Sequence, residues 1–111
     1  TMALFHNITT VLTKDLLNQF EKQGINENLK NSDKVICKFF NPCGSQTWYA
    51  IKFNPKTRIF YGFADMGFPE FGTFSLDELE SVIIKPFGLG IERDLYFTQI
   101  TVEQLKTQYN M

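Results

Sequence analysis

Two cysteines and one histidine are the side chains of this chain that most readily carry out covalent chemistry. Cys43 lies in the turn-forming stretch Asn-Pro-Cys-Gly-Ser, where a thiol is expected to be exposed, and His6 is the single histidine. A cysteine nucleophile needs a neighbouring base or a cation that lowers its pKa. His6 is far away near the N-terminus and no charge adjoins Cys43, so we interpret Cys43 as an ordinary turn residue. A cysteine-dependent enzyme is therefore the weakest of three function classes.

Metal ligands and paired carboxylates are equally sparse. Cys37 and Cys43 are six residues apart, a longer spacing than in the cysteine pairs of structural zinc sites. Asp65 and Glu70 are candidates for an acid–base pair, but two acidic residues in a loop are more often solvated. No glycine-rich phosphate-binding motif is present. The sequence therefore predicts no metal, no cofactor and no enzymatic activity.

The loop of residues 65–71 carries side chains suited to binding instead of catalysis. Met66, Phe68 and Phe71 stand among residues that favour turns, and turns usually lie at the surface. Exposed aromatic side chains and methionines are typical anchors of protein interfaces. We expect this loop to bind a partner protein, with Glu70 and Trp48 as further contacts. The alternative is that Phe68 and Phe71 fold inward and close the core.

Three adjacent charges, Glu92, Arg93 and Asp94, lie between apolar residues in the tract 86–97. Some of these charges are expected to lie near buried surface and to find partners there. We predict an ionic cluster in which Arg93 pairs with Asp94, Glu92 or Asp65, serving as a structural clamp or a recognition feature. The apolar flanks are Ile91, Leu95, Tyr96 and Phe97.

Composition limits what the whole chain can be. With 111 residues there is room for one domain, and 43% hydrophobic and 15% aromatic residues, twelve of them phenylalanine, place it in the globular class. A net charge of −1 argues against a nucleic-acid-binding protein. Two cysteines are too few for a disulfide framework, and no signal peptide or membrane span is visible. We therefore expect a cytoplasmic protein.

Local patterns predict a single α+β domain over residues 1–111. A helix begins at the N-cap Thr13 and ends at Gly24, strands cover residues 34–40, 46–53 and 58–64, and a short strand covers 72–74. Ser75 with Glu78, and Thr101 with Gln104, form capping boxes that open two more helices. Residues 95–98 are predicted as a last strand. The expected fold is an antiparallel β-meander sheet with about three α-helices packed on it.

Strand alternation divides this meander into two faces. One face is expected to carry Val35, Cys37, Phe39, Tyr49, Ile51, Phe53, Ile59, Tyr61 and Phe63, as a core face. The other combines aromatic rings such as Trp48 with Lys38, Lys52 and Arg58. Such a face can stack bases and hold phosphates. The favoured alternative is that a helix covers the rings while the cationic side chains extend to water.

Five tracts follow one another in a characteristic order: KFFNPCG (38–44), TWY (47–49), DMGFPEFG (65–72), FSLDELE (74–80) and PFGLGIERDLYF (86–97). Together they resemble the bacterial domain-of-unknown-function family 2958, over about residues 11–106. The resemblance implies an accessory protein of plasmids and other mobile elements, without enzymatic activity. The chain is also similar to a small effector of an intracellular pathogen that inhibits companion ubiquitin-deamidating effectors.

Together these observations predict a non-catalytic protein-binding module, a small inhibitor or regulator of a partner enzyme. The partner is expected to be another protein, such as an effector enzyme. A homodimer of the module is a further possibility. Binding to a membrane is not expected. The runner-up is a DNA-associated accessory factor of a mobile element that uses the face of Trp48 and Lys52.

Overall fold

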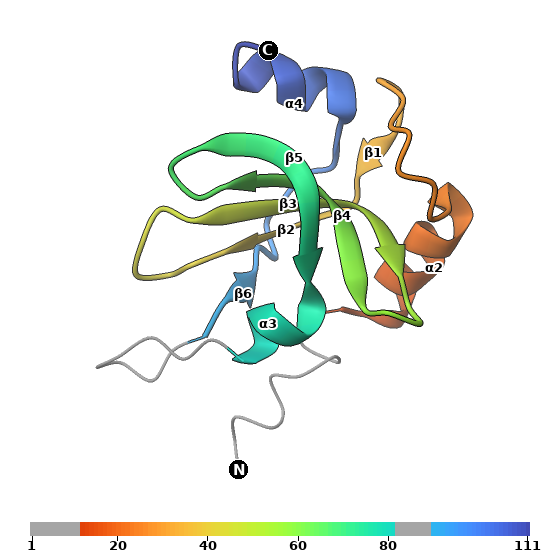
Figure 1. Ribbon diagram of the computed structural model, residues 1–111, viewed down its shortest axis with the longest axis horizontal. Helices are drawn as coiled ribbons and strands as arrows, with labels where there is room; N and C mark the ends of the chain where they lie inside the picture. The colour runs from red at the N-terminus through yellow and green to blue at the C-terminus, as the bar shows by residue number, and fades with distance from the viewer. Residues whose placement is uncertain (1–11, 82–89) are drawn as a thin grey trace.

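A computed structural model describes residues 12–81 and 90–111 of the chain (Figure 1). His6, Val82 and residues 86–89 of the charged tract lie outside these ranges. The helices are α2 (Lys14–Gln23), α3 (Leu76–Ser81) and α4 (Val102–Gln108). The strands are β1 (Lys34–Val35), β2 (Cys37–Phe40), β3 (Thr47–Asn54), β4 (Ile59–Asp65), β5 (Pro69–Ser75), β6 (Glu92–Arg93) and β7 (Ile100–Thr101).

Five of these strands form one antiparallel sheet in the order β5-β4-β3-β2-β6. Strands β2 to β5 follow one another along the chain and across the sheet, which confirms the predicted meander. β1 pairs with β7 in a separate two-stranded sheet. The predicted strand 34–40 is therefore two strands, interrupted at Ile36, whose N–H donates to the Ala50 carbonyl at 2.9 Å.

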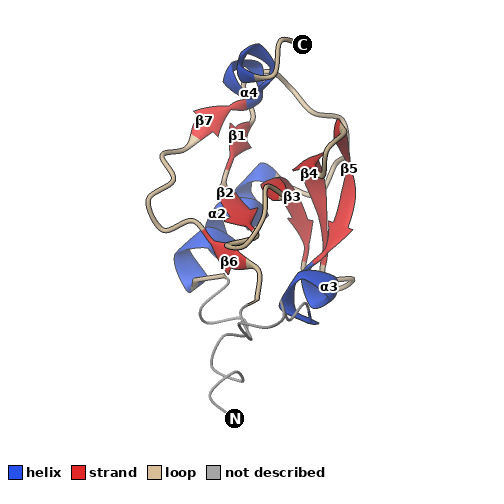
Figure 2. Cartoon of the chain, turned by 90° about the vertical axis from the view of Figure 1, so that its left-hand side faces the viewer, coloured by secondary structure: helices blue, strands red, loops and turns tan. Residues whose placement is uncertain are grey.

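Two apolar cores lie on opposite faces of the large sheet, because successive residues of β3 alternate between them. α2 and α3 cover one face and α4 covers the other, as Figures 1 and 2 show. The fold class is thus α+β, as predicted. The first core includes Leu16, Phe20, Phe39, Trp48, Phe53, Phe60, Leu76 and Leu79. The second core includes Val35, Tyr49, Ile51, Phe63, Val102 and Leu105.

The predicted division of the strands into two faces is wrong, for two local reasons. The interruption at Ile36 places Val35 in the second core but Cys37 and Phe39 in the first. A register shift between Ala50 and Lys52 leaves one extra residue in β3, so that alternation changes phase there. Both faces are buried, and neither carries an open row of rings and cations.

The helix ends follow the predicted capping chemistry. The Thr13 hydroxyl accepts the Leu16 N–H at 3.2 Å, and Gly24 ends α2 with a φ of 83°, a conformation that glycine adopts without strain. Thr101 and Gln104 form the complete capping box of α4. Local signals of this kind need only three or four neighbouring residues. They are therefore readable before any tertiary contact is known.

Two strand predictions need correction. Residues 95–98 form no strand: Leu95 and Tyr96 lie in a turn, where the Asp94 carboxylate accepts the Tyr96 N–H at 2.9 Å, and residues 97–98 have no regular secondary structure. β5 is seven residues long instead of three, and it begins at Pro69. Proline is tolerated at the first position of an edge strand, where its missing N–H breaks no ladder bond. None of the helices in the described ranges is long and apolar enough to cross a membrane.

Candidate functional site

The most exposed apolar residues of the β4–β5 hairpin lie in its three-residue loop, Met66, Gly67 and Phe68, here called the hairpin tip. Phe68 is 83% exposed and Met66 is 54% exposed. Gly67 adopts a φ of 101°, and its N–H donates to the Asp65 carboxylate at 3.2 Å. The tip is thus a tight turn that holds a phenylalanine and a methionine out in solvent, where a partner can bury both side chains.

Beside the hairpin, β3 is joined to the end of α4 by polar contacts. The hydroxyls of Tyr49 and Tyr109 lie 3.1 Å apart, and the Gln108 amide donates to the Tyr49 hydroxyl at 3.4 Å. Burial, the Tyr49 hydroxyl and the Asp65 carboxylate together raise the pKa of Tyr109 far above its ordinary value. The Tyr109 phenol therefore stays protonated. Asp65, which contributes to this shift, is the last residue of β4 and adjoins the hairpin tip.

The remaining residues of the expected binding loop divide between surface and core. Glu70 is exposed on β5, directly beyond the tip. Phe71 packs edge-on against Phe63 at 4.8 Å between ring centroids and is half-buried against the second core. Trp48 is only 8% exposed and belongs to the first core. Among the five expected contact residues, the structure leaves Met66, Phe68 and Glu70 at the surface.

The charged tract does not form the predicted cluster around Arg93. Asp94 pairs with Lys38 at 3.8 Å, and no carboxylate pairs with Arg93 among the described residues. The Arg93 Nε is buried and has no hydrogen-bond partner among the described residues, and the guanidinium charge partly offsets the burial that raises the pKa of the Cys37 thiol. Glu92 is exposed, and Asp65 belongs to the hairpin.

The apolar flank of this tract divides between surface and core. Tyr96 is 94% exposed and Leu95 is 69% exposed, whereas Phe97 packs on Tyr49 at 6.4 Å between ring centroids. The Asp94 turn explains the difference, because it turns these two residues out of the sheet.

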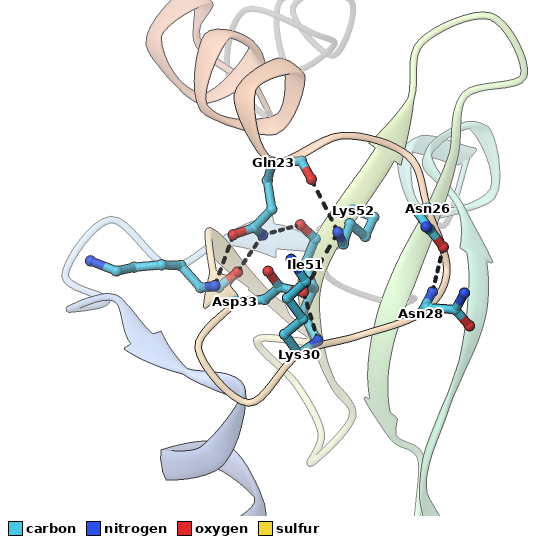
Figure 3. A network of polar contacts seen from close by, with 8 residues as sticks. Gln23, Asn26, Asn28, Lys30, Asp33, Ile51 and Lys52 are labelled. Atoms are coloured by element: carbon cyan, nitrogen blue, oxygen red, sulfur yellow. Dashed lines mark hydrogen bonds and ion pairs between the residues drawn. The ribbon is translucent and has the colours of Figure 1, made fainter.

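A polar network around Lys52 was not predicted from the sequence (Figure 3). Lys52 is 5% exposed, and its ammonium donates to the Gln23 carbonyl at 3.0 Å and lies 3.6 Å from the Asp33 carboxylate. The Gln23 carboxamide donates to the carbonyls of Lys34 and Ile51 and accepts the Lys34 N–H. These contacts fasten the end of α2 and the loop that follows it to β3. They engage the lysine structurally and leave it unsuited to bind phosphate.

Arg58, another cation of the predicted nucleic-acid face, is also held by ion pairs within the chain. Its guanidinium donates to Asp77 at 2.6 Å and to Glu80 at 2.8 Å, and its backbone has a positive φ of 59° in the β3–β4 turn. The hydrogen bond to Asp77 is the leading cause that raises the pKa of Arg58. Arg58 therefore fastens α3 to the β3–β4 turn.

The cysteines offer no catalytic arrangement in the described residues. Cys37 is buried in the first core, and burial raises the pKa of its thiol, so that it stays protonated. Cys43 is exposed in the β2–β3 turn, where its N–H donates to the Asn41 side chain at 2.8 Å. Within residues 12–81 and 90–111, no group of three histidine, cysteine or carboxylate residues is placed to hold a metal ion.

Comparison with known proteins supplies a family. The model of a protein family of unknown function, DUF2958, matches residues 8–106. No curated protein and no solved structure matches the chain. The matched region contains both cores, the hairpin tip and the charged tract. Since the match covers nearly all of the sequence, the chain belongs to the DUF2958 family.

Proposed function

We propose that this chain is a non-catalytic protein-binding module that occludes or regulates a partner enzyme, with the hairpin tip as its anchor. The observation that carries the proposal is the 83% exposure of Phe68 on a short, braced turn. A rigid aromatic anchor loses little conformational entropy when it binds, so most of its burial free energy contributes to affinity. Resemblance to an effector inhibitor makes a ubiquitin-deamidating effector the first purified partner to test.

Nothing in the structure favours the DNA-associated alternative. It relied on Trp48, Lys38, Lys52 and Arg58. Trp48 and Lys52 are buried, Lys38 pairs with Asp94, and Arg58 is held by two carboxylates. A base-stacking surface needs exposed rings beside free cations. We therefore keep protein binding as the single proposed function.

The test is a paired measurement on Phe68→Ala. Because the side chain is exposed, the thermal unfolding midpoint is expected to stay unchanged, while affinity for the partner falls about thirty-fold, the usual loss for a buried aromatic anchor. Wild-type and variant chains are used as baits in a lysate of the source cells and compared by quantitative mass spectrometry, then titrated against the purified partner.

Tyr96→Ala is the matched control, because Tyr96 is an even more exposed ring on another loop. It should retain every partner that the wild-type chain captures. Two results would overturn the proposal: a melting curve that collapses in Phe68→Ala, or partners that bind equally well to wild type and Phe68→Ala.

A further inference from the structure

Charge is distributed unevenly along the chain. The stretch from Ile59 to Ser81, which forms β4, the hairpin tip, β5 and α3, contains five carboxylates and neither lysine nor arginine. The rest of the chain contains seven acidic and eleven basic residues. The net charge of −1 therefore conceals an acidic segment, with Asp65 and Glu70 on the hairpin and three carboxylates on α3, attached to a basic remainder.

Strand register places the acidic side chains relative to the tip. Glu92, Phe40, Thr47, Asp65 and Pro69 form one row across the sheet, at the end where the β2–β3 and β4–β5 loops emerge. Glu92 and Glu70 are exposed at this end, and the β2–β3 loop of residues 41–46 carries no charged residue.

Two cations near β2 and β4 are already paired with carboxylates, whereas Arg93, beside Glu92 on β6, pairs with no carboxylate of the described residues. Lys38 pairs with Asp94 and lies over the Tyr49 ring, and Arg58 pairs with two carboxylates of α3, at the opposite end of β4. No salt bridge of the described residues involves Glu70 or Glu92. Asp65 and Glu70 are thus the charged residues of the hairpin that carries the tip, and both are negative, while Glu92 lies on β6 at the opposite edge of the sheet.

We infer that the partner of the hairpin tip is a protein with an apolar pocket whose rim carries lysine or arginine side chains. This inference rests on the proposed function and specifies its partner. Phe68 fills the pocket, Met66 covers its edge, and Glu70 faces the cationic rim. Complementary charge at the rim of an interface steers the encounter and raises the association rate more than it slows dissociation.

Two other kinds of partner are less compatible with the negative charge beside the hairpin tip. Nucleic acid carries phosphates, which this end of the sheet repels. A second copy of this chain that docked tip to tip would bring Glu70 against Glu70, because a two-fold contact presents the same surface on both sides. A cationic protein partner meets neither penalty.

The experiment begins with p-benzoylphenylalanine in place of Phe68 in the full chain. Light-induced cross-linking in a lysate of the source cells, followed by peptide mapping, identifies the partner and the segment that receives the tip. Association and dissociation rates with that purified partner are then measured at about 50 and about 300 mM salt, a range over which screening lengths shorten markedly.

Glu70→Lys is compared with Glu103→Lys, which makes the same charge change at an exposed position of α4. We expect lysine or arginine beside the cross-linked residue and a wild-type association rate that falls with salt. At low salt, Glu70→Lys should associate about ten-fold more slowly, and Glu103→Lys should stay within about two-fold of wild type.

A cross-linked segment without basic residues, or equal association rates for the two charge variants, would refute the cationic rim while leaving the anchor role of Phe68 intact. A capture pattern that does not depend on Phe68 would instead refute the proposed function itself. The two failures are thus distinguishable by the Phe68→Ala comparison.

Discussion

Lys52 shows how one buried charge can join three parts of the chain. Its ammonium contacts the end of α2 and the Asp33 carboxylate from a position on β3. A cation at a helix C-terminus interacts favourably with the unpaired carbonyl groups there. Removing the ammonium leaves Asp33, whose side chain is only 15% exposed, without its cation.

We therefore expect Lys52→Met to lower the free energy of unfolding by about 3 kcal/mol, in the range for a broken buried ion pair. Lys38→Met is the matched control, because the Lys38–Asp94 pair is 28% and 27% exposed and should contribute less than about 1 kcal/mol. Urea denaturation of both variants measures the difference. Equal losses of unfolding free energy in the two variants would mean that the buried Lys52 pair stabilises the fold no more than the Lys38 pair does.

The sequence predicted single residues well where the signal was local. The caps at Thr13 and Thr101 depend on hydroxyl acceptors three residues before the N–H they receive, so they were predicted correctly. Phe68 and Phe71 carry the same side chain and stand three residues apart, yet one is exposed and the other packs on Phe63. Only the hairpin register separates them, and register is a property of strand pairs.

Among elements, the attachment of β3 to the end of α4 has the clearest energetic consequence. Tyr109 sits at the C-cap of α4 and its hydroxyl meets Tyr49, with Asp65 at the base of the tip contributing to its raised pKa. Because the folded-state pKa lies above the ordinary value of 10.0, the folded chain holds this proton more tightly than the unfolded chain. The resulting stability is complete below about pH 10 and is lost as the pH rises above it.

Tyr109→Phe should accordingly lower the free energy of unfolding by about 1 kcal/mol at pH 7, the net value of a typical hydrogen bond. The difference from wild type should shrink as the pH is raised from about 9 to about 11. Denaturant unfolding across this range provides the measurement, with the exposed Tyr96→Phe as control. A constant difference at all pH values would show that the Tyr109 proton is not linked to folding.

Element types were predicted better than their contacts. The meander and all three helices were confirmed, because apolar periodicity and turn residues specify them locally. The phase change at Ile51 was missed, since an extra residue in one strand is visible only against its partner. Gly62 is the residue of β4 at this shift, and only glycine fits there, because a side chain would overlap the Tyr49 carbonyl oxygen.

At the scale of the whole molecule, the reaction rates of the two cysteine thiols test which of them is exposed and which is buried. Cys43 is exposed, and Cys37 is buried on β2, between β3 and β6. We expect one thiol per native chain to react quickly with Ellman's reagent and the second to react only as the molecule opens. In Cys43→Ser the fast phase should disappear, and the slow phase should accelerate with urea. Fast reaction of both thiols would contradict the packed first core.

Contacts between distant parts of the molecule were beyond the reach of the sequence. The Tyr49–Tyr109 pair joins residues 60 positions apart, and Lys52 reaches back 29 positions to Gln23. Each is specified by how α4 and α2 cover opposite faces of the sheet. The exposed tip could be predicted as a candidate because it lies within one short loop.

The two edge strands of the five-stranded sheet differ in length, and this difference affects how easily another strand can pair with each edge. β6 is two residues long, too short to template another strand, while β5 presents seven residues with one side unpaired in the sheet. Pro69 at the start of β5 has no N–H to offer, and Glu70 places a charge on the same edge. Both features disfavour edge-to-edge stacking. Fibril growth from the β5 edge is therefore less favourable than the twelve phenylalanines alone would suggest.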